Sequence, residues 1–260
     1  MVVSVERFRS DAATAGILLD FDGTLSQLVP MPSDARPYEG VGDALAALSE
    51  RYRTVAIVSG RSARELLEWL GPTIDIWGVH GAERTRDGEV VVSDMAAPYM
   101  DLMKKVREEA ERRVEALAMP GILVEDKGVM IGLHYRATED QDVAARELGR
   151  VTNELAERFE LHQAAGKRAF ELRAPVEFSK AKVVLAVARE ASLDPVLFAG
   201  DDVVDLPAFD ALDELEREGA GVLRVAVSSD EAPAEMLERA DLVVEGPKGM
   251  LELLRRLGEA

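Results

Sequence analysis

The chain has 260 residues, with 31 basic and 49 acidic side chains and a formal net charge of −18. This negative balance argues against nucleic acid and anionic membranes as partners, because both attract proteins through Lys and Arg. With no cysteine, the chain has no disulfide, thiolate metal ligand or cysteine nucleophile. No apolar run approaches the ~20 residues that span a bilayer, and the first residues lack the apolar core of a signal peptide. We therefore expect a cytoplasmic protein with one large domain or two smaller ones.

The first part of the chain alternates short apolar runs with helical patterns. Apolar runs typical of buried strands cover residues 17–19, 54–58 and 74–79. Apolar residues at helical spacing cover 39–52 and 62–70, and Ser62 is a candidate N-cap of the second helix. This alternation predicts an open parallel sheet covered by helices.

The middle of the chain has a different pattern. Asp87-Gly88 is a hairpin signal. It precedes two expected helices, at 97–117 and 140–158, and four expected strands, at 122–125, 129–135, 159–163 and 169–172. From Ser179 the first pattern returns, with strands at 195–199, 222–226 and 242–244 between helices. The predicted fold class is α/β: a Rossmann-like parallel-sheet core (1–84 and 175–260) with an inserted α+β module (85–174).

Acidic residues follow two of the expected buried strands. Asp20 and Asp22 follow the first strand, and Asp201, Asp202 and Asp205 follow the strand at 195–199. Ligands of open parallel sheets bind outside the carboxyl ends of the strands, and Mg²⁺ prefers oxygen ligands. These residues are therefore candidates for a metal site. The alternatives are a solvated turn at Asp22-Gly23 and helix caps at Asp202 or Asp205.

A hydroxyl and a lysine are available for an anion at the same edge. Ser59-Gly60 stands at a strand end before a helix, where free N–H groups favour a phosphate. Lys180 stands at a helix start, where a cation opposes the helix dipole unless an anion is near. An ordinary helix cap and a surface lysine are the alternatives, and Lys182 is a rival for the role of Lys180.

These elements, in this order, resemble the haloacid dehalogenase superfamily over the whole chain. The resemblance implies that Asp20 is the nucleophile, Asp22 the general acid and base, and Ser59, Gly60 and Lys180 the phosphate-binding groups. It also implies Mg²⁺ bound by Asp20, the backbone carbonyl of Asp22 and Asp201, with Asp202 and Asp205 in support. The core would then be the catalytic domain, and residues 85–174 the cap that sets substrate specificity.

The insertion point and several segments more closely resemble trehalose-6-phosphate phosphatases. Residues 78–83, the Glu125-Asp126-Lys127-Gly128 hairpin with His134-Tyr135-Arg136, and Glu171-Leu172-Arg173 are similar to segments of that family. The resemblance implies that Glu125, Lys127 and Glu171 bind sugar hydroxyls. It makes further substrate-binding candidates of Arg61, His80, Glu83, His134 and Arg136. The alternatives are a Glu125–Lys127 ion pair, and a solvated strand face for His134 and Arg136.

The implied activity is Mg²⁺-dependent hydrolysis of trehalose 6-phosphate through an aspartyl-phosphate. Departures from the family pattern at Val204, Leu206-Pro207, Ala181 and Met130 bear on the substrate and not on the chemistry. Alternatives are a phosphatase of another sugar phosphate or of glucosyl- or mannosyl-3-phosphoglycerate, a phosphomutase, and a non-catalytic phosphosugar-binding protein. A trehalose-phosphate synthase is a possible partner, and the sequence does not specify an oligomeric state.

Overall fold

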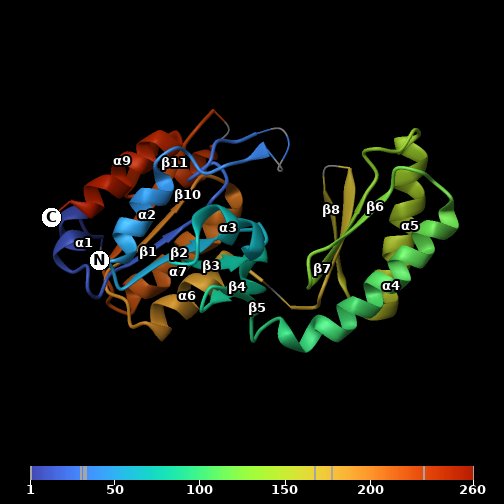
Figure 1. Cartoon of the computed structure of the whole chain (residues 1–260), viewed down its shortest axis with the longest axis horizontal. Helices are drawn as coiled ribbons and strands as arrows, with labels where there is room; N and C mark the ends of the chain where they lie inside the picture. The colour runs from blue at the N-terminus through green and yellow to red at the C-terminus, as the bar shows by residue number, and fades with distance from the viewer. Residues whose placement is uncertain are drawn as a thin grey trace. The chain divides into compact units, whose positions relative to one another are not determined.

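The computed structural model describes residues 2–29, 31, 34–166, 168–176, 178–230 and 232–259. The chain divides into two compact units (Figure 1). The larger unit comprises Met1–Val91 and Phe178–Ala260, and the smaller comprises Val92–Glu177.

The larger unit is built on a sheet whose described strands follow the order β12-β11-β10-β1-β2-β3-β4-β5. Their bounds are β1 Gly16–Leu19, β2 Thr54–Val58, β3 Asp75–Gly78, β4 Glu83–Arg86, β5 Glu89–Val92, β10 Val196–Gly200, β11 Val222–Ser228 and β12 Leu242–Glu245. The pairs from β12 to β3 are parallel, and β4 runs antiparallel to β3. The predicted parallel sheet is confirmed.

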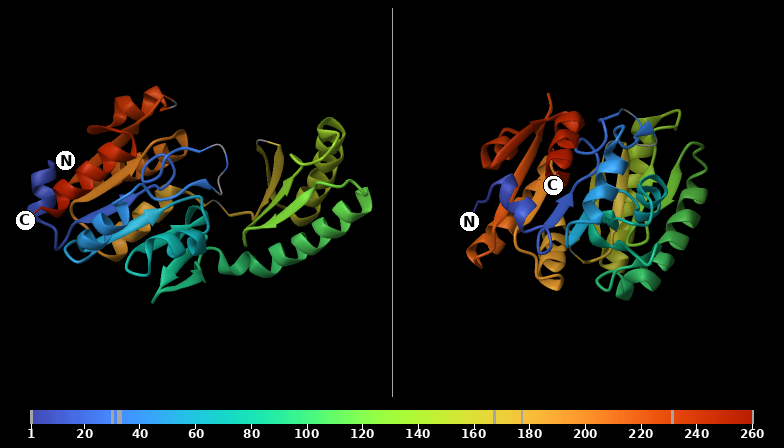
Figure 2. Two further views of the ribbon diagram at one scale, coloured as in Figure 1. Left: turned by 45° about the horizontal axis from the view of Figure 1, so that its top comes forward. Right: turned by 60° about the vertical axis from the view of Figure 1, so that its left-hand side comes forward.

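Helices cover both faces of this sheet (Figures 1 and 2). One apolar cluster joins the sheet to α1 Val5–Ser10, α2 Val41–Ser49, α3 Ala63–Leu70 and α9 Gly246–Gly258. The other joins it to α6 Lys180–Glu190, α7 Leu206–Arg217 and α8 Ala234–Arg239. The short 3₁₀ turns η2 Val79–Gly81 and η4 Val203–Asp205 follow β3 and β10. With both faces covered, all four residues of β1 are buried, as its apolar run predicts.

Strand register places the candidate site residues at one edge. Leu19 at the end of β1 pairs with Ile57 on β2 and with Ala199 on β10. The residues that follow these three strands therefore leave the sheet at the same level. Asp20, Ser59 and Asp201 are among them.

The smaller unit pairs a four-stranded antiparallel sheet with two long helices. Its strands are β6 Leu123–Asp126, β7 Met130–His134, β8 His162–Gly166 and β9 Ala169–Arg173, in the order β6-β7-β9-β8. The short turn η3 Ala97–Tyr99 leads into α4 Met100–Leu117, and α5 is Gln141–Phe159. Asp140 caps α5 by accepting a hydrogen bond from the Val143 N–H at 2.9 Å.

Three details differ from the sequence expectations. The α5 helix continues to Phe159 and ends at Glu160, whose φ of 54° is left-handed, so β8 begins three residues later than expected. The Asp87-Gly88 hairpin, grouped from the sequence with the insertion, adds β4 and β5 to the edge of the large sheet. Helix α1 was not expected, because six residues are too few to show a helical period. Within the described residues, none of the helices combines the length and apolarity needed to cross a bilayer.

Candidate active site

Asp20 and Lys180 meet in the interior at the carboxyl edge of the large sheet. Asp20 follows β1 and is 5% exposed, and Lys180 is the first residue of α6 and is 2% exposed. The Lys180 Nζ donates to Asp20 Oδ1 and to Asp205 Oδ1, both at 2.5 Å. Burial alone would lower the pKa of Lys180, but the two carboxylates outweigh it and raise that pKa. Lys182, the rival from the sequence, is exposed.

Asp205 is a buried organiser of this cluster. One of its oxygens accepts from Lys180, and Oδ2 accepts from the backbone N–H groups of Asp201 at 3.0 Å and Asp202 at 3.2 Å. The Asp205 carboxyl lies so close to the backbone at position 200 that only glycine fits there, because a Cβ would lie 2.5 Å from that carboxyl. Asp202 accepts from the Val203 N–H at 2.6 Å, and so acts as a cap, as the alternative from the sequence allows.

Three buried carboxylates could hold a divalent metal. Asp20, Asp201 and Asp205 each offer an oxygen within 4.8 Å of the others. Burial, reinforced by Asp205, raises the pKa of Asp20 well above its usual range and that of Asp201 to about 7. The negative charges of these carboxylates repel one another, and a divalent cation that prefers oxygen ligands would offset the repulsion. The three carboxylates therefore fit such an ion. The side chains of Asp22 and Asp202 are not in this group; for Asp22 the expected ligand was the backbone carbonyl.

The carboxylate of Asp22 is held by Arg61. The Arg61 guanidinium donates to both oxygens of Asp22, at 2.7 and 2.8 Å, and to Glu65 at 3.0 Å. It also lies over the rings of Phe21 and Trp69, 5.8 and 5.2 Å from their centroids. The sequence interpretation assigned Arg61 to the substrate and missed this pairing. The position of Arg61 just beyond a strand end at the same edge could have indicated it.

Ser59, Gly60 and their neighbours form the start of α3. Ser59 is 1% exposed, and its Oγ accepts from the Arg61 N–H at 3.2 Å. His80 lies so close to Gly60 that a Cβ there would be 2.9 Å from the imidazole. Glu83 accepts from the Ala63 N–H at 2.9 Å, so it satisfies a free donor of the first helical turn. The three expected substrate residues of the larger unit, Arg61, His80 and Glu83, therefore all lie near the start of this helix.

Two of the expected sugar-binding residues of the smaller unit, Glu125 and Glu171, share one face of its sheet. Glu125 pairs in register with Gly132, which pairs with Glu171, so both glutamates flank the same glycine. Glu125 contacts Lys127 at 3.2 Å and His134 at 2.9 Å, and Glu171 is paired with Arg173. The ion pair weighed as the alternative for Glu125 and Lys127 is therefore present. Arg136 lies beyond the end of β7 and is exposed.

A family model described as trehalose-phosphatase matches residues 18–241. The chain belongs to the trehalose-phosphatase family. The match includes the candidate site residues of both units, so the resemblance seen in the sequence motifs is confirmed.

Individual relatives agree with this assignment. The trehalose-phosphate phosphatase of Mycolicibacterium paratuberculosis is 30% identical over 94% of this chain. The chain spans 62% of that relative's length and 30–52% of the length of other curated relatives. The crystal structure of a trehalose-6-phosphate phosphatase related protein has a TM-score of 0.71 and 25% identity, covering 94% of this chain and 97% of its own. A haloacid dehalogenase-like hydrolase from Bacteroides thetaiotaomicron has a TM-score of 0.63 at 16% identity, covering 93% of this chain and 98% of its own. The predicted haloacid dehalogenase-like fold is confirmed.

Proposed function

We propose that this chain is a Mg²⁺-dependent phosphatase that hydrolyses trehalose 6-phosphate to trehalose and phosphate. The observation that carries the proposal is the buried contact between Asp20 and Lys180, beside two further carboxylates at the carboxyl edge of the sheet. Membership of the trehalose-phosphatase family supports the substrate.

In the proposed first step, Asp20 attacks phosphorus and the bond to the sugar oxygen breaks. Lys180 binds Asp20 Oδ1, which leaves Oδ2 of the same carboxylate as the nucleophile. For this step Asp22 must carry a proton, so one of its oxygens has to part from Arg61; Asp22 then gives that proton to the departing sugar oxygen, and an aspartyl-phosphate remains on Asp20. In the second step, Asp22 takes a proton from the attacking water, and phosphate leaves as the Asp20 carboxylate is restored.

The groups around Asp20 neutralise charge on the phosphoryl oxygens. We propose that Lys180, Ser59 and the N–H groups at Gly60 hold these oxygens, since phosphoryl transfer depends mainly on positioning and electrostatics. Asp20 and Asp201, with the Asp22 carbonyl, would hold Mg²⁺, and Asp202 and Asp205 would support them. The ion, when bound, supplies positive charge to the transferring phosphoryl group. Asp205 would act indirectly, because both of its oxygens are occupied by Lys180 and backbone N–H groups.

Recognition of the sugar is proposed for the inserted segment, residues 85–174, acting as a cap on a catalytic core of residues 1–84 and 175–260. Glu125, Lys127 and Glu171 would bind hydroxyls, because carboxylates accept and ammonium groups donate hydrogen bonds. Arg61, His80, Glu83, His134 and Arg136 are the remaining substrate-binding candidates. A trehalose-phosphate synthase remains a proposed partner, which size-exclusion chromatography of the mixed proteins would test.

A substrate panel with Mg²⁺ tests the proposal. We expect phosphate release from trehalose 6-phosphate with a kcat/KM at least about tenfold above that for glucose 6-phosphate, a difference of about 1.4 kcal/mol. EDTA should abolish turnover, and added Mg²⁺ should restore it. Comparable kcat/KM values on several sugar phosphates would reject trehalose specificity and favour a phosphatase of another sugar phosphate.

The variant Asp20→Asn tests the nucleophile in the same assay. It preserves side-chain size, so we expect an unchanged circular dichroism spectrum and turnover reduced by several orders of magnitude, because no carboxylate remains to attack. Full activity in this variant would reject the aspartyl-phosphate. Asp43→Asn, at an exposed site on α2, is the matched control.

A further inference from the structure

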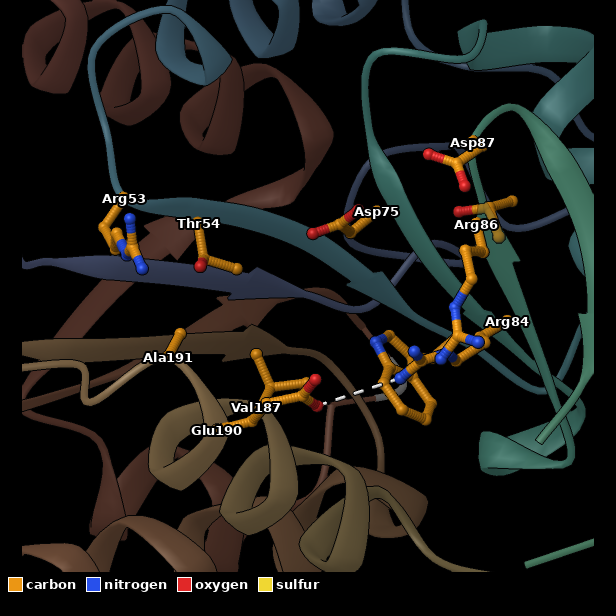
Figure 3. Close-up of a pocket in the computed structure, with 11 residues that line it drawn as sticks. Arg53, Thr54, Asp75, Arg84, Arg86, Asp87, Val187, Glu190 and Ala191 are labelled. Carbon is orange, nitrogen blue, oxygen red and sulfur yellow. Dashed lines mark ion pairs between the residues drawn. The ribbon is translucent and has the colours of Figure 1, made fainter. Parts of the chain in front are cut away.

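A cavity of about 450 Å³ lies in the larger unit (Figure 3), at the edge of the sheet where the parallel strands begin. Thr54, in its lining, begins β2 and pairs with Gly16, the first residue of β1. Asp20 follows the last residue of β1, so the cavity and Asp20 lie at opposite ends of these strands. The cavity is completed by the start of β3, the β4–β5 hairpin and the end of α6. Its lining contains none of the candidate active-site residues.

The lining is rich in ionisable groups. Its polar members are Arg53, Thr54, Asp75, Arg84, Thr85, Arg86, Asp87 and Glu190. The Arg84 guanidinium lies 5.1 Å from the centroid of the Trp77 ring and 3.8 Å from the Glu190 carboxylate. Arg84 and Arg86 are two residues apart on β4, so their side chains leave the strand on the same face (Figure 3). The lining balances three arginines with three carboxylates, Asp75, Asp87 and Glu190, so it suits a ligand that carries both an anionic group and hydrogen-bond donors.

Three of these side chains are left without a direct hydrogen bond or ion pair to another described residue. Across the part of the chain that the structure describes, the side chains of Arg53, Asp75 and Arg86 make no hydrogen bond or ion pair. Burial raises the pKa of the Asp75 carboxyl, Arg84 opposes this shift and Glu190 adds to it. The cavity thus combines guanidinium donors at both ends, Arg86 near Arg84 and Arg53 near Thr54, with the Asp75 carboxylate as an acceptor between them (Figure 3).

We propose that this cavity is a second ligand site, for a small phosphate ester that also carries hydroxyl groups. The phosphate would bind Arg84 and Arg86, because guanidinium forks match phosphate oxygens in pairs. A ligand hydroxyl would donate to Asp75, and Arg53 and Thr54 would complete the polar wall. The volume lies within the range typical of small-molecule sites. A ligand held here would contact the last turn of α6, the helix whose first residue is Lys180.

Calorimetric titration of the full chain tests this site, with glucose 6-phosphate as the probe and EDTA present to suppress turnover. We expect saturable binding that Arg86→Ala and Asp75→Asn each weaken by about tenfold or more, the effect of losing a charge-assisted hydrogen bond. Neither side chain makes a hydrogen bond or ion pair with another described residue, so the variants should keep the melting temperature of the wild type. Arg64→Ala, an exposed arginine on α3, is the matched control and should bind as the wild type does.

Further titrations in the same experiment identify the chemistry of the ligand and the place where it binds. Glucose lacks the anion and inorganic phosphate lacks the carbon-bound hydroxyls, so each should bind at least about tenfold more weakly than glucose 6-phosphate. Asp20→Asn should leave the cavity affinity unchanged. Binding abolished by Asp20→Asn and unaffected by Arg86→Ala would place the probe at the candidate active site and overturn the proposal. No saturable binding at millimolar probe would overturn it as well, and neither outcome bears on the proposed phosphatase activity.

Discussion

Arg61 shows how one side chain can connect two motifs that are distant in the sequence. It joins the strand end after β2 to Asp22 after β1 through two hydrogen bonds, and its stacking on Phe21 and Trp69 limits its movement. Arg36 lies 5.2 Å from the centroid of the same Trp69 ring. Because a general acid must be oriented toward the departing oxygen, Arg61 is suited to be a positioning residue for Asp22.

Arg61→Lys should therefore impair the step that depends on protonation of the leaving group. Lysine keeps the charge but cannot make two parallel hydrogen bonds to one carboxylate. We expect kcat to fall about tenfold or more on trehalose 6-phosphate, and much less on p-nitrophenyl phosphate, whose phenolate leaves without a proton.

The comparison of the two substrates separates positioning from a general structural effect. Arg64→Lys, on the exposed side of the same helix, should have no effect on either substrate. An equal loss on both substrates in Arg61→Lys would contradict the positioning role.

At the scale of elements, Glu109 holds the two long helices of the smaller unit together. Its side chain on α4 is 10% exposed and accepts from Arg113 at 3.0 Å and from Arg158 on α5 at 3.1 Å, with Arg112 as a third donor. The hydrogen bond from Arg113, with the other arginines, lowers the pKa of Glu109 below its usual value. Most residues of α4 are charged or polar, and its buried apolar residues are Met103, Val106 and Ala110. The contacts of Glu109 add to the packing of these three residues.

Acidification should therefore loosen this helix pair. A carboxyl whose pKa is lower in the folded state contributes stability above its unfolded pKa of about 4.3, and loses it as the pH falls through the folded value. We expect wild-type urea midpoints to decrease from pH 5 to pH 3.

Glu109→Gln should lower the midpoint at pH 7 and flatten this pH dependence. Glu108→Gln, an exposed neighbour on the same helix, is the control and should follow the wild-type curve. An unchanged slope in Glu109→Gln would show that Glu109 does not couple proton binding to folding.

At the scale of the whole molecule, the larger unit has cores of its own. Every buried residue of its two apolar clusters comes from residues 3–77 or 183–257, and none comes from the smaller unit. The Asp20–Lys180–Asp205 contacts also lie wholly within it. The larger unit should therefore fold without the insertion.

Replacing residues 92–177 by a flexible Gly/Ser linker of about ten residues, which spans ~17 Å, tests this expectation. We expect a cooperatively folding protein that still hydrolyses p-nitrophenyl phosphate in the presence of Mg²⁺. Its preference for trehalose 6-phosphate over glucose 6-phosphate should fall about tenfold, because the proposed sugar-binding residues are removed. Retention of the full preference would show that specificity resides in the larger unit.

The sequence pattern alone determined the strands of the parallel sheet and the edge of that sheet at which the candidate active-site residues lie. Apolar runs such as 54–58 fit a fully buried parallel strand, and a polar residue after such a run must lie at the carboxyl edge. The sequence therefore predicts that the motifs at Asp20, Ser59, Lys180 and Asp201 lie together at this edge. Local signals also predicted the Asp87-Gly88 turn, where both residues have positive φ.

Only the tertiary structure decided which of these side chains pair. The sequence favours Lys180 but keeps Lys182 as a weaker rival, and packing of α6 on the sheet decides between them, because it buries Lys180 between two carboxylates and leaves Lys182 exposed. The bond from Arg61 to Asp22 and the second cavity likewise join residues from separate elements. Sequence periodicity reports which face of an element is buried. It carries no information on which charged groups meet across elements, because the approach of the elements in space sets those distances.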